Sequence, residues 1–142
     1  MKIGIANDHH GIDLKKQIIE YFEKKNIEYV DYGCNEKNNV DYIDYAELLC
    51  KDINYKKIDL GILICGTGIG MSIAANKMKG IIAAKVNSPR EAKLCKEHNM
   101  ANVITLAEYT QNVEEIIELF ITTPYSMEER HNRRYNKIMN LK

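Results

Sequence analysis

Residues 58–70 read Ile-Asp-Leu-Gly-Ile-Leu-Ile-Cys-Gly-Thr-Gly-Ile-Gly, and this stretch decides the fold. Its first part, Ile58 to Cys65, is a nearly continuous apolar run, which is typical of a parallel strand covered by helices on both faces. Its second part has glycine at positions 66, 68 and 70, where a helix predicted at 68–78 begins. A buried strand that passes through glycines into a helix predicts an α/β fold with this loop at the carboxyl end of the strand.

Strands and helices alternate through the rest of the chain. Further strands are predicted at 2–7, 27–32, 81–86 and 102–106, and further helices at 11–25, 41–54, 89–97, 113–121 and about 126–140. In the helix at 41–54 we expect Tyr45, Leu48 and Leu49 to face inward. The pattern predicts one domain, residues 1–142, with a three-layer Rossmann-like α/β fold, a five-stranded parallel sheet and a C-terminal helical extension.

Composition excludes several functional classes. The chain has 20 Lys and Arg against 20 Asp and Glu, and nucleic-acid binders usually carry a basic excess, so no nucleic-acid partner is expected. No apolar run approaches the ~20 residues that span a bilayer, and none near the N-terminus fits a signal peptide, so we expect a cytoplasmic protein without a membrane partner. The four cysteines form no C-x-x-C pair, so we expect free thiols, no metal and no cofactor (Cys34, Cys50, Cys65 and Cys95).

The glycine loop admits two interpretations. Closely spaced glycines before a helix let backbone N–H groups converge on an anion such as a phosphate, a carboxylate or an enediolate. The alternative is a tight turn that binds nothing. Two familiar phosphate loops are excluded, because the dinucleotide motif needs glycine where Met71 stands and the P-loop needs lysine where Thr67 stands.

Two candidate residue groups follow strand ends. Cys65 directly precedes the loop, so it is a candidate thiolate nucleophile or base, although a buried core cysteine is the alternative. Asp8, His9 and His10 follow the first strand. Adjacent side chains on an extended segment point to opposite sides, so we expect only one of these histidines to face a given site, and a plain polar loop is the alternative.

Two further candidate groups belong to helices. His98 and Asn99 end a predicted helix, where the dipole favours a histidine that has no function. Arg130 and Arg134 are four residues apart and share a helix face, so they can clamp a phosphate. A solvated basic face, paired with neighbouring glutamates, is the alternative.

At this point a family resemblance becomes visible. Residues 64–77, Ile-Cys-Gly-Thr-Gly-Ile-Gly-Met-Ser-Ile-Ala-Ala-Asn-Lys, closely resemble the signature of ribose-5-phosphate isomerase B, within the ribose/galactose isomerase family of sugar-phosphate isomerases. Weaker similarities follow in order along essentially the whole chain: Asp8-His9-x-Gly11, Asp41-Tyr42, His98-Asn99-x-x-Asn102-Val103, and Thr122-Thr123-Pro124-Tyr125 through Arg130-His131-x-x-Arg134.

The resemblance implies an aldose-ketose isomerase that interconverts ribose 5-phosphate and ribulose 5-phosphate through an enediolate. It implies that Cys65 is the base, that Thr67 helps to move the proton, and that His98 opens the sugar ring with assistance from Asp8. It assigns substrate binding to the remaining residues: Gly66, Gly68, Ile69 and Gly70 as the anion hole, Tyr42 as a pocket wall, Asn99 on the hydroxyls or the enediolate, and His9, Arg130 and Arg134 on the phosphate.

The chain departs from the family pattern at four positions. Ile43, Ile82 and Met100 replace the usual proline, arginine and aspartate, and Tyr109 stands where some members carry a further phosphate arginine. The proton-transfer residues are unchanged. The departures bear on the substrate, so a galactose-6-phosphate or other hexose-phosphate isomerase, or one of its subunits, stays an alternative. A non-catalytic sugar-phosphate-binding module is a further alternative.

The order of the elements also bears on the assembly. Cys65 ends a strand, whereas His98 ends the helix that returns to the opposite edge of the sheet. A strand of 5–6 residues is ~17–20 Å long, so the two residues cannot share a substrate within one chain. We therefore expect a homodimer or a dimer of dimers with the active site at the subunit interface, which agrees with the family.

Overall fold

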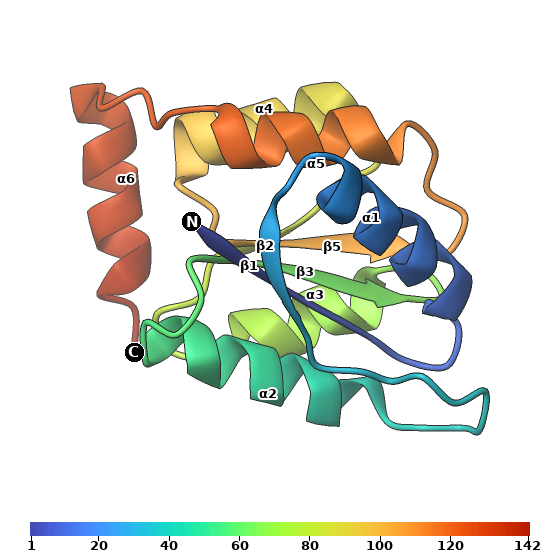
Figure 1. The fold of residues 1–142 in the computed structure, drawn as a ribbon. Coiled ribbons are helices and arrows are strands. Elements are labelled where there is room, and N and C mark those ends of the chain that lie inside the picture. The colour runs from blue at the N-terminus through green and yellow to red at the C-terminus, as the bar shows by residue number, and fades with distance from the viewer.

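The computed structural model describes all of residues 1–142 and shows a parallel five-stranded sheet with the strand order β2-β1-β3-β5-β4 (Figure 1). The strands are β1 (Lys2–Asn7), β2 (Glu28–Asp31), β3 (Leu60–Cys65), β4 (Ala83–Lys85) and β5 (Val103–Ala107). The helices are α1 (Ile12–Lys24), α2 (Tyr42–Asn54), α3 (Ile69–Asn76), α4 (Pro89–Asn99), α5 (Val113–Thr122) and α6 (Glu129–Met139). The predicted α/β fold with a five-stranded parallel sheet is confirmed.

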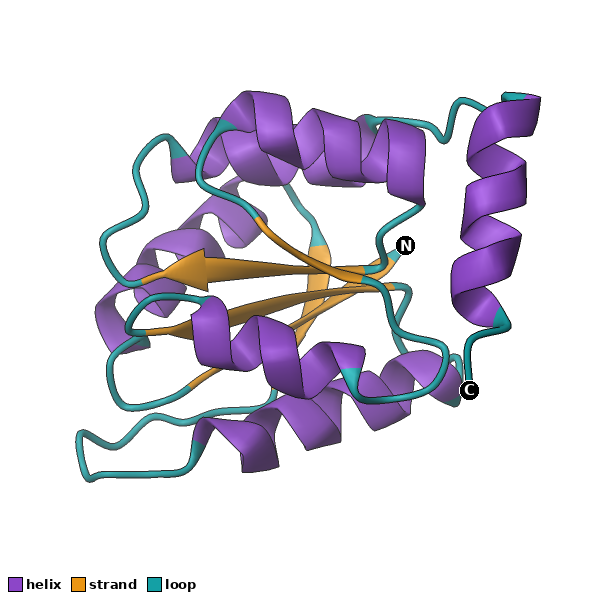
Figure 2. Cartoon of the chain, turned by 180° about the vertical axis from the view of Figure 1, so that it is seen from behind, coloured by secondary structure: helices purple, strands orange, loops and turns teal.

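Helices cover both faces of the sheet, which gives the predicted three layers. One apolar core lies between the sheet and helices α1, α4 and α5, and a second lies between the sheet and helices α2 and α3 (Figures 1 and 2). Strand β3 contributes to both cores, because successive side chains point to opposite faces. Ile62 and Ile64 join the first core, whereas Leu63 and Cys65 join the second. The Cys65 side chain therefore faces α2 and α3.

Helix α6 lies outside the three layers, off the edge of the sheet opposite the strand arrowheads (Figure 1). It is the predicted C-terminal extension. The segment before it is anchored to α4 by a hydrogen bond of 3.0 Å from the Ser126 N–H to the Glu97 carbonyl. The helix begins at Glu129 rather than near Ser126, because Met127 has a left-handed backbone conformation with φ 57°.

The expected inward face of α2 needs one correction. Leu48 was expected to face inward, but it is 51% exposed. The buried residues of this helix are Ala46, Leu49 and Cys50, and Tyr45 is half-buried. One residue turns an α-helix by about 100°, so with Leu49 and Ala46 centred on the sheet, Leu48 is rotated toward solvent.

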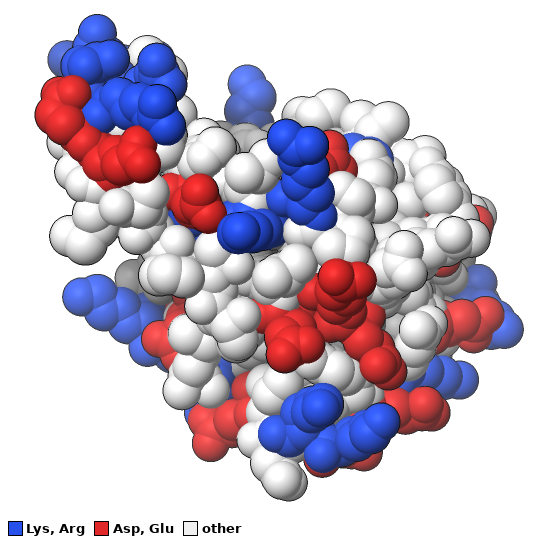
Figure 3. All heavy atoms as spheres, turned by 90° about the horizontal axis from the view of Figure 1, so that it is seen from above, with Lys and Arg blue, Asp and Glu red and all other residues white.

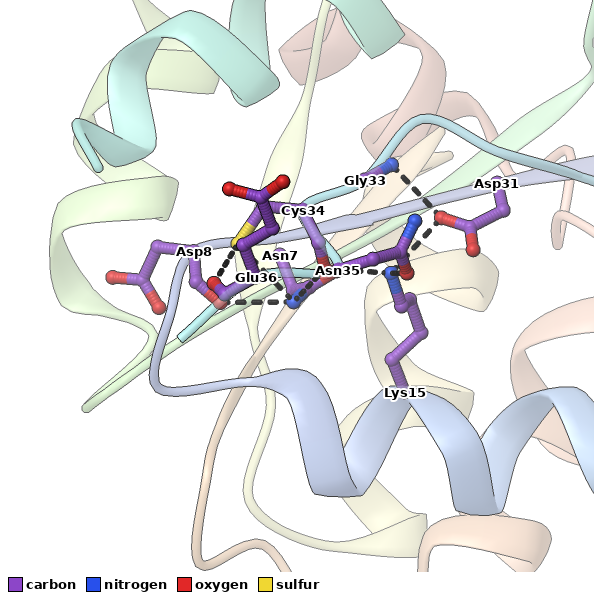
Figure 4. A network of polar contacts seen from close by, with 8 residues as sticks. All are labelled: Asn7, Asp8, Lys15, Asp31, Gly33, Cys34, Asn35 and Glu36. Atoms are coloured by element: carbon purple, nitrogen blue, oxygen red, sulfur yellow. Dashed lines mark hydrogen bonds and ion pairs between the residues drawn. The ribbon is translucent and has the colours of Figure 1, made fainter. Parts of the chain in front are cut away.

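A buried lysine joins the ends of β1 and β2. The Lys15 side chain on α1 is only 2% exposed, and its ammonium group donates to Asp31 Oδ1 at 3.1 Å, the Cys34 carbonyl at 2.8 Å and Asn35 Oδ1 at 2.6 Å (Figure 4). The Asn7 side-chain amide donates to the same Cys34 carbonyl, at 3.0 Å, and to the Asp8 carbonyl, at 2.8 Å. The network therefore fixes the loop after β2 against the residues that follow β1.

This network predicts a large loss of stability when its charge is removed. Lys15→Met removes three hydrogen bonds and the buried ammonium group that pairs with Asp31, and breaking a buried charge pair typically costs ~3–5 kcal/mol of unfolding free energy. The exposed neighbour Lys16 is the matched control, and Lys16→Met should change stability by less than ~0.5 kcal/mol. Urea unfolding of the two variants measures the difference, and equal stabilities would contradict the role of Lys15.

Candidate active site

Sheet register brings Asp8 next to Cys65. Asn7 of β1 pairs with Ile64 of β3, and Cys65 pairs with Ala107 of β5. The Asp8 N–H then donates to the Ile64 carbonyl at 3.1 Å. The carboxyl ends of the three central strands therefore lie level at one edge of the sheet, where ligands of such folds bind.

The glycine loop turns a backbone amide toward the Cys65 thiol. Cys65 is 4% exposed, and the Gly68 N–H donates to its Sγ at 3.2 Å. Gly68 has φ 77°, and a Cβ there would lie 3.0 Å from the carbonyl carbon of Leu106. The Thr105 hydroxyl holds this turn by donating to the Gly68 carbonyl at 2.8 Å. Both the left-handed conformation and the close approach to β5 thus require glycine at position 68.

The remaining parts of the loop carry two further candidates. The Thr67 hydroxyl oxygen accepts from the Ile69 N–H at 3.2 Å, at the first residue of α3. The ring of Tyr42 covers Gly70, because a Cβ at Gly70 would lie 2.5 Å from Tyr42 Cζ. Thr67, Tyr42 and the loop glycines therefore line the same edge of the sheet as Cys65.

Asp8 and His9 have defined orientations beside the loop. Asp8 is buried, and its Oδ1 accepts from the His10 N–H at 2.9 Å. The Val40 N–H donates to His9 Nδ1 at 3.3 Å, so in the neutral ring the proton is assigned to Nε2, which is then free to donate to a ligand.

The expectation that the two adjacent histidines point to opposite sides is wrong. Residues 9 and 10 form a turn rather than an extended segment, and the ring centroids lie 4.2 Å apart. His10 also pairs with Glu108 at 3.2 Å and would lie 3.6 Å from a Cβ on Gly66. Both rings therefore lie beside the loop.

A second group of candidates lies at the opposite edge of the sheet. His98, Asn99 and Arg134 line a cavity of about 180 Å³ between the end of α4 and helix α6, together with His131, Tyr135 and Ile138. Arg130 is not part of the lining, and its Nε lies 3.0 Å from Glu128 Oε2 on the surface. At the corner occupied by α6, a group of basic side chains lies beside a group of acidic ones (Figure 3).

The two groups do not meet within one chain. Strand β3 has six residues, which at about 3.3 Å each separate its ends by about 20 Å. Cys65 is the last residue of this strand, whereas His98 lies in the last turn of α4, which returns the chain to the other end of the sheet. The structure thus places Cys65, Thr67, Asp8, His9 and Tyr42 in one group, and His98, Asn99 and Arg134 in another.

Sequence reasoning assigned no role to His131, which is buried in the second group. Burial lowers the pKa of His131, and the nearby His98 and Arg130 lower it further, so the ring is neutral near pH 7. A signal was present in the sequence, because His131, Arg134, Tyr135 and Ile138 recur at the helical spacing of a single face.

The other three thiols have environments that disfavour the thiolate. Burial raises the pKa of Cys50 to about 12 and that of Cys95 to about 11, and it also raises the pKa of Cys34. None of these sulfurs accepts a hydrogen bond from a glycine loop. Cys65 is therefore the one cysteine whose sulfur accepts a hydrogen bond from the glycine loop.

A buried thiol facing a glycine loop, at the carboxyl edge of a three-layer parallel sheet, defines an α/β enzyme site suited to an anionic ligand. The side chains include no group of three or more His, Cys, Asp or Glu residues that could hold a metal ion. No helix is both long enough and apolar enough to cross a membrane.

Known proteins resemble the whole chain. The family model described as Ribose/Galactose Isomerase matches residues 3–138. A putative sugar phosphate isomerase of Bacillus subtilis, YwlF, is 41% identical over 97% of this chain and 95% of its own length. A probable ribose-5-phosphate isomerase B of Mycoplasma genitalium is 42% identical over 96% of this chain and 93% of its own length.

Solved structures agree with these relatives. A ribose 5-phosphate isomerase of Thermotoga maritima has a TM-score of 0.94 and 40% identity, over 99% of this chain and 98% of that one. The Mycoplasma genitalium ribose-5-phosphate isomerase B with bound ribulose-5-phosphate has a TM-score of 0.90 and 40% identity, over 97% of this chain and 93% of that one. The chain belongs to the ribose/galactose isomerase family and is a sugar-phosphate isomerase of the ribose-5-phosphate isomerase B type.

The thiol environments predict selective alkylation. Iodoacetamide reacts with thiolates, so at neutral pH it should modify Cys65 before the other three cysteines, because raised pKa values keep those thiols protonated. Cys50 should react most slowly of the four, because it is fully buried and burial raises its pKa to about 12. Peptide mass spectrometry measures the order, and faster labelling of Cys34, Cys50 or Cys95 in the folded protein would contradict it.

Proposed function

We propose that this protein interconverts ribose 5-phosphate and ribulose 5-phosphate through an enediolate, in the cytoplasm and without a metal or cofactor. The observation that carries the proposal is the buried Cys65 thiol, which accepts the Gly68 N–H inside the glycine loop. The relative with bound ribulose-5-phosphate supports the choice of substrate, since its fold matches this chain over nearly its whole length.

The proposed chemistry is a pair of proton transfers. Cys65, as the thiolate, removes the proton from C2 of the open-chain aldose, and negative charge develops on O1. Backbone N–H groups of residues 66–70 stabilise this charge, which is a large contribution in reactions of this kind. Thr67 helps to move the hydroxyl proton from O2 to O1. The Cys65 thiol then returns its proton to C1, which completes the ketose and regenerates the thiolate.

Ring opening requires the second group of residues. We assign this step to His98, with Asp8 assisting at the ring oxygens, Asn99 on the sugar hydroxyls or the enediolate, and His9, Arg130 and Arg134 on the phosphate. Because His98 and Cys65 lie at opposite edges of the sheet, a partner subunit must supply His98, Asn99 and the two arginines to each Cys65 site. The active enzyme in this proposal is a homodimer or a dimer of dimers.

The surface beside the loop suits such an assembly. An apolar groove of about 400 Å³ lies between α2 and α3 and is lined in part by Tyr42, Ile43 and Ile73. Ile73 is 59% exposed, and Ile69, the first residue of α3, is 53% exposed. Exposed apolar residues next to an incomplete site favour a second copy of this chain as the covering surface.

A hexose phosphate is the second candidate substrate, because the matching family includes galactose isomerases and because Tyr109 leaves position 109 without a phosphate arginine. Turnover of ribose 5-phosphate, compared with turnover of galactose 6-phosphate and of one other hexose phosphate, separates the two candidates. Binding of all three without turnover would instead favour a non-catalytic binding module.

The role of Cys65 predicts a loss in kcat. Cys65→Ala should bind substrate nearly normally but lose ~10²–10⁴-fold in kcat, because that is the typical contribution of general base catalysis. Cys95→Ala is the control, since Cys95 packs in the core near α5, and it should leave kcat unchanged. Steady-state kinetics with ribose 5-phosphate measures both, and a near-normal kcat in Cys65→Ala would refute the assignment.

The role of the arginines predicts an increase in KM when either is removed. Arg134→Ala should raise the KM for ribose 5-phosphate roughly 10- to 100-fold, since a hydrogen bond to a charged group is worth about 1.5–3 kcal/mol, and Arg130→Ala should act in the same direction. Neither variant should affect the weak turnover of unphosphorylated ribose. Arg133, which pairs with Glu129 at 3.1 Å on the surface, provides the control variant Arg133→Ala. Equal losses on both substrates would show that α6 has only a structural role.

The shared site predicts complementation between impaired variants. Cys65→Ala and His98→Asn should each keep only a small residual activity alone. When the two are refolded together in equal amounts, half of the dimers are mixed and each has one intact site, so about a quarter of full activity should return. If both residues served one site within a single chain, no mixed dimer would contain an intact site and activity would stay at the residual level of the two variants.

A further inference from the structure

His131 is a buried histidine that the proposed mechanism does not use. Its Nδ1 lies 2.6 Å from the Ser126 hydroxyl oxygen. That oxygen also accepts from the Glu128 N–H at 3.2 Å, and the Ser126 N–H donates to the carbonyl of Glu97 at 3.0 Å. Ser126 therefore holds His131 and is itself anchored to the residue that precedes His98.

The ring of His131 packs against the ring of His98. The two centroids are 4.5 Å apart and the planes are tilted by 30°. His98 has little else to hold it, because its Nε2 lies 3.6 Å from the half-exposed Glu97 carboxylate, which is too long for a good hydrogen bond. A histidine at a helix end can adopt several rotamers, so the packed ring of His131 selects among them.

The charges around His131 keep it from competing for the proton. The cationic neighbours Arg130 and Arg134 and the ring of His98 surround it, and Glu128 Oε2 is 4.0 Å from Nδ1. After accepting from the Glu128 N–H, the Ser126 hydroxyl still has its O–H donor and one free lone pair, so it can pair with Nδ1 in either tautomer of the neutral ring. A neutral ring held by this hydrogen bond can orient a neighbour without titrating with it.

We propose that His131, oriented by Ser126, is a positioning residue that fixes the His98 ring toward the cavity it shares with Asn99 and Arg134. This inference rests on the proposed function, in which His98 opens the sugar ring. A misplacement of about 1 Å in a reacting group can cost about 100-fold in rate, so a fixed His98 ring has a direct catalytic consequence.

Two other roles for His131 make different predictions. A purely structural residue would dock α6 onto α4, and its loss would act independently of His98. A direct phosphate ligand would contact the phosphate group of the substrate together with Arg134, and its loss would weaken binding of inorganic phosphate. A positioning residue acts only through His98 and leaves phosphate binding unchanged.

The first experiment is a double-mutant cycle on kcat/KM for ribose 5-phosphate. His131→Asn can keep a hydrogen bond to Ser126 but removes the ring, and we expect it to lower kcat/KM roughly 10- to 100-fold. In a His98→Asn background the same change should cause no further loss. The inhibition constant of inorganic phosphate should be the same in His131→Asn and in the parent protein.

The matched control is Arg133→Ala on the exposed face of the same helix, which should leave kcat/KM unchanged. Losses that add in the His98→Asn background would overturn the inference in favour of a structural role. Weaker phosphate inhibition would overturn it in favour of a direct ligand. A normal kcat/KM in His131→Asn would overturn it altogether.

A second measurement does not depend on turnover. The ring protons of His98, observed by NMR in the parent protein, should shift in His131→Asn because the stacked ring is lost. If His131→Asn fails to fold, Ser126→Ala is the variant to measure. It removes the hydrogen bond to His131 but keeps both rings, and it should shift the same His98 signals. Unchanged His98 signals would overturn the inference even in an active enzyme, whereas absence of turnover in the parent protein would overturn only the proposed function.

Discussion

The direction of the parallel strands is the constraint on which the rest of this structure depends. All five strands carry the chain toward one edge of the sheet, and the helices bring it back to the other. Residues at the ends of strands therefore gather at one edge, as Asp8 and Cys65 do. Residues at the ends of helices gather at the other edge, as His98 does. The length of a six-residue strand keeps these two groups apart.

At the carboxyl edge, backbone geometry matters as much as side chains. Gly68 adopts a left-handed conformation against β5, and Thr105 holds its carbonyl. The same turn directs the Gly68 N–H at the Cys65 sulfur. On the other side of Cys65, the buried Lys15 and the Asn7 amide fix the chain around Asp8. The chain around Cys65 and Asp8 is thus held by buried polar contacts, which are costly to break in a low-dielectric interior.

At the opposite edge, one helix outside the layers makes the second group possible. Helix α6 covers no face of the sheet, and it meets α4 through Ser126, Glu97 and the packed pair His98 and His131. Arg134 of α6 and the end of α4 line a cavity that contains no thiol. The Cys65 edge, in turn, has a thiol and a glycine loop beside an uncovered apolar groove. Each edge lacks what the other has, which is the physical reason to expect a symmetric assembly.

The sequence by itself determined the fold class, because apolar runs and helical spacing depend on local periodicity. The continuous run at 58–65 and the glycines after it located the central strand and its loop. The resemblance at residues 64–77 supplied the family, which the matching model and solved structures confirm. The roles of Cys65, Thr67, His98 and the arginines stay predictions. Local pattern could also show that Cys65 and His98 lie at opposite edges, since that follows from element order alone.

Only the tertiary structure decided the contacts between segments that are distant in sequence. Leu48 turned outward because the neighbouring helix and sheet select which stripe of α2 is buried. His9 and His10 lie side by side because a turn, and not a strand, continues after β1. The pairing of His98 with His131 depends on how α6 docks against α4, and the burial of Lys15 depends on acceptors 16 to 20 residues away. Such contacts are set by packing in three dimensions, which no periodicity in one dimension encodes.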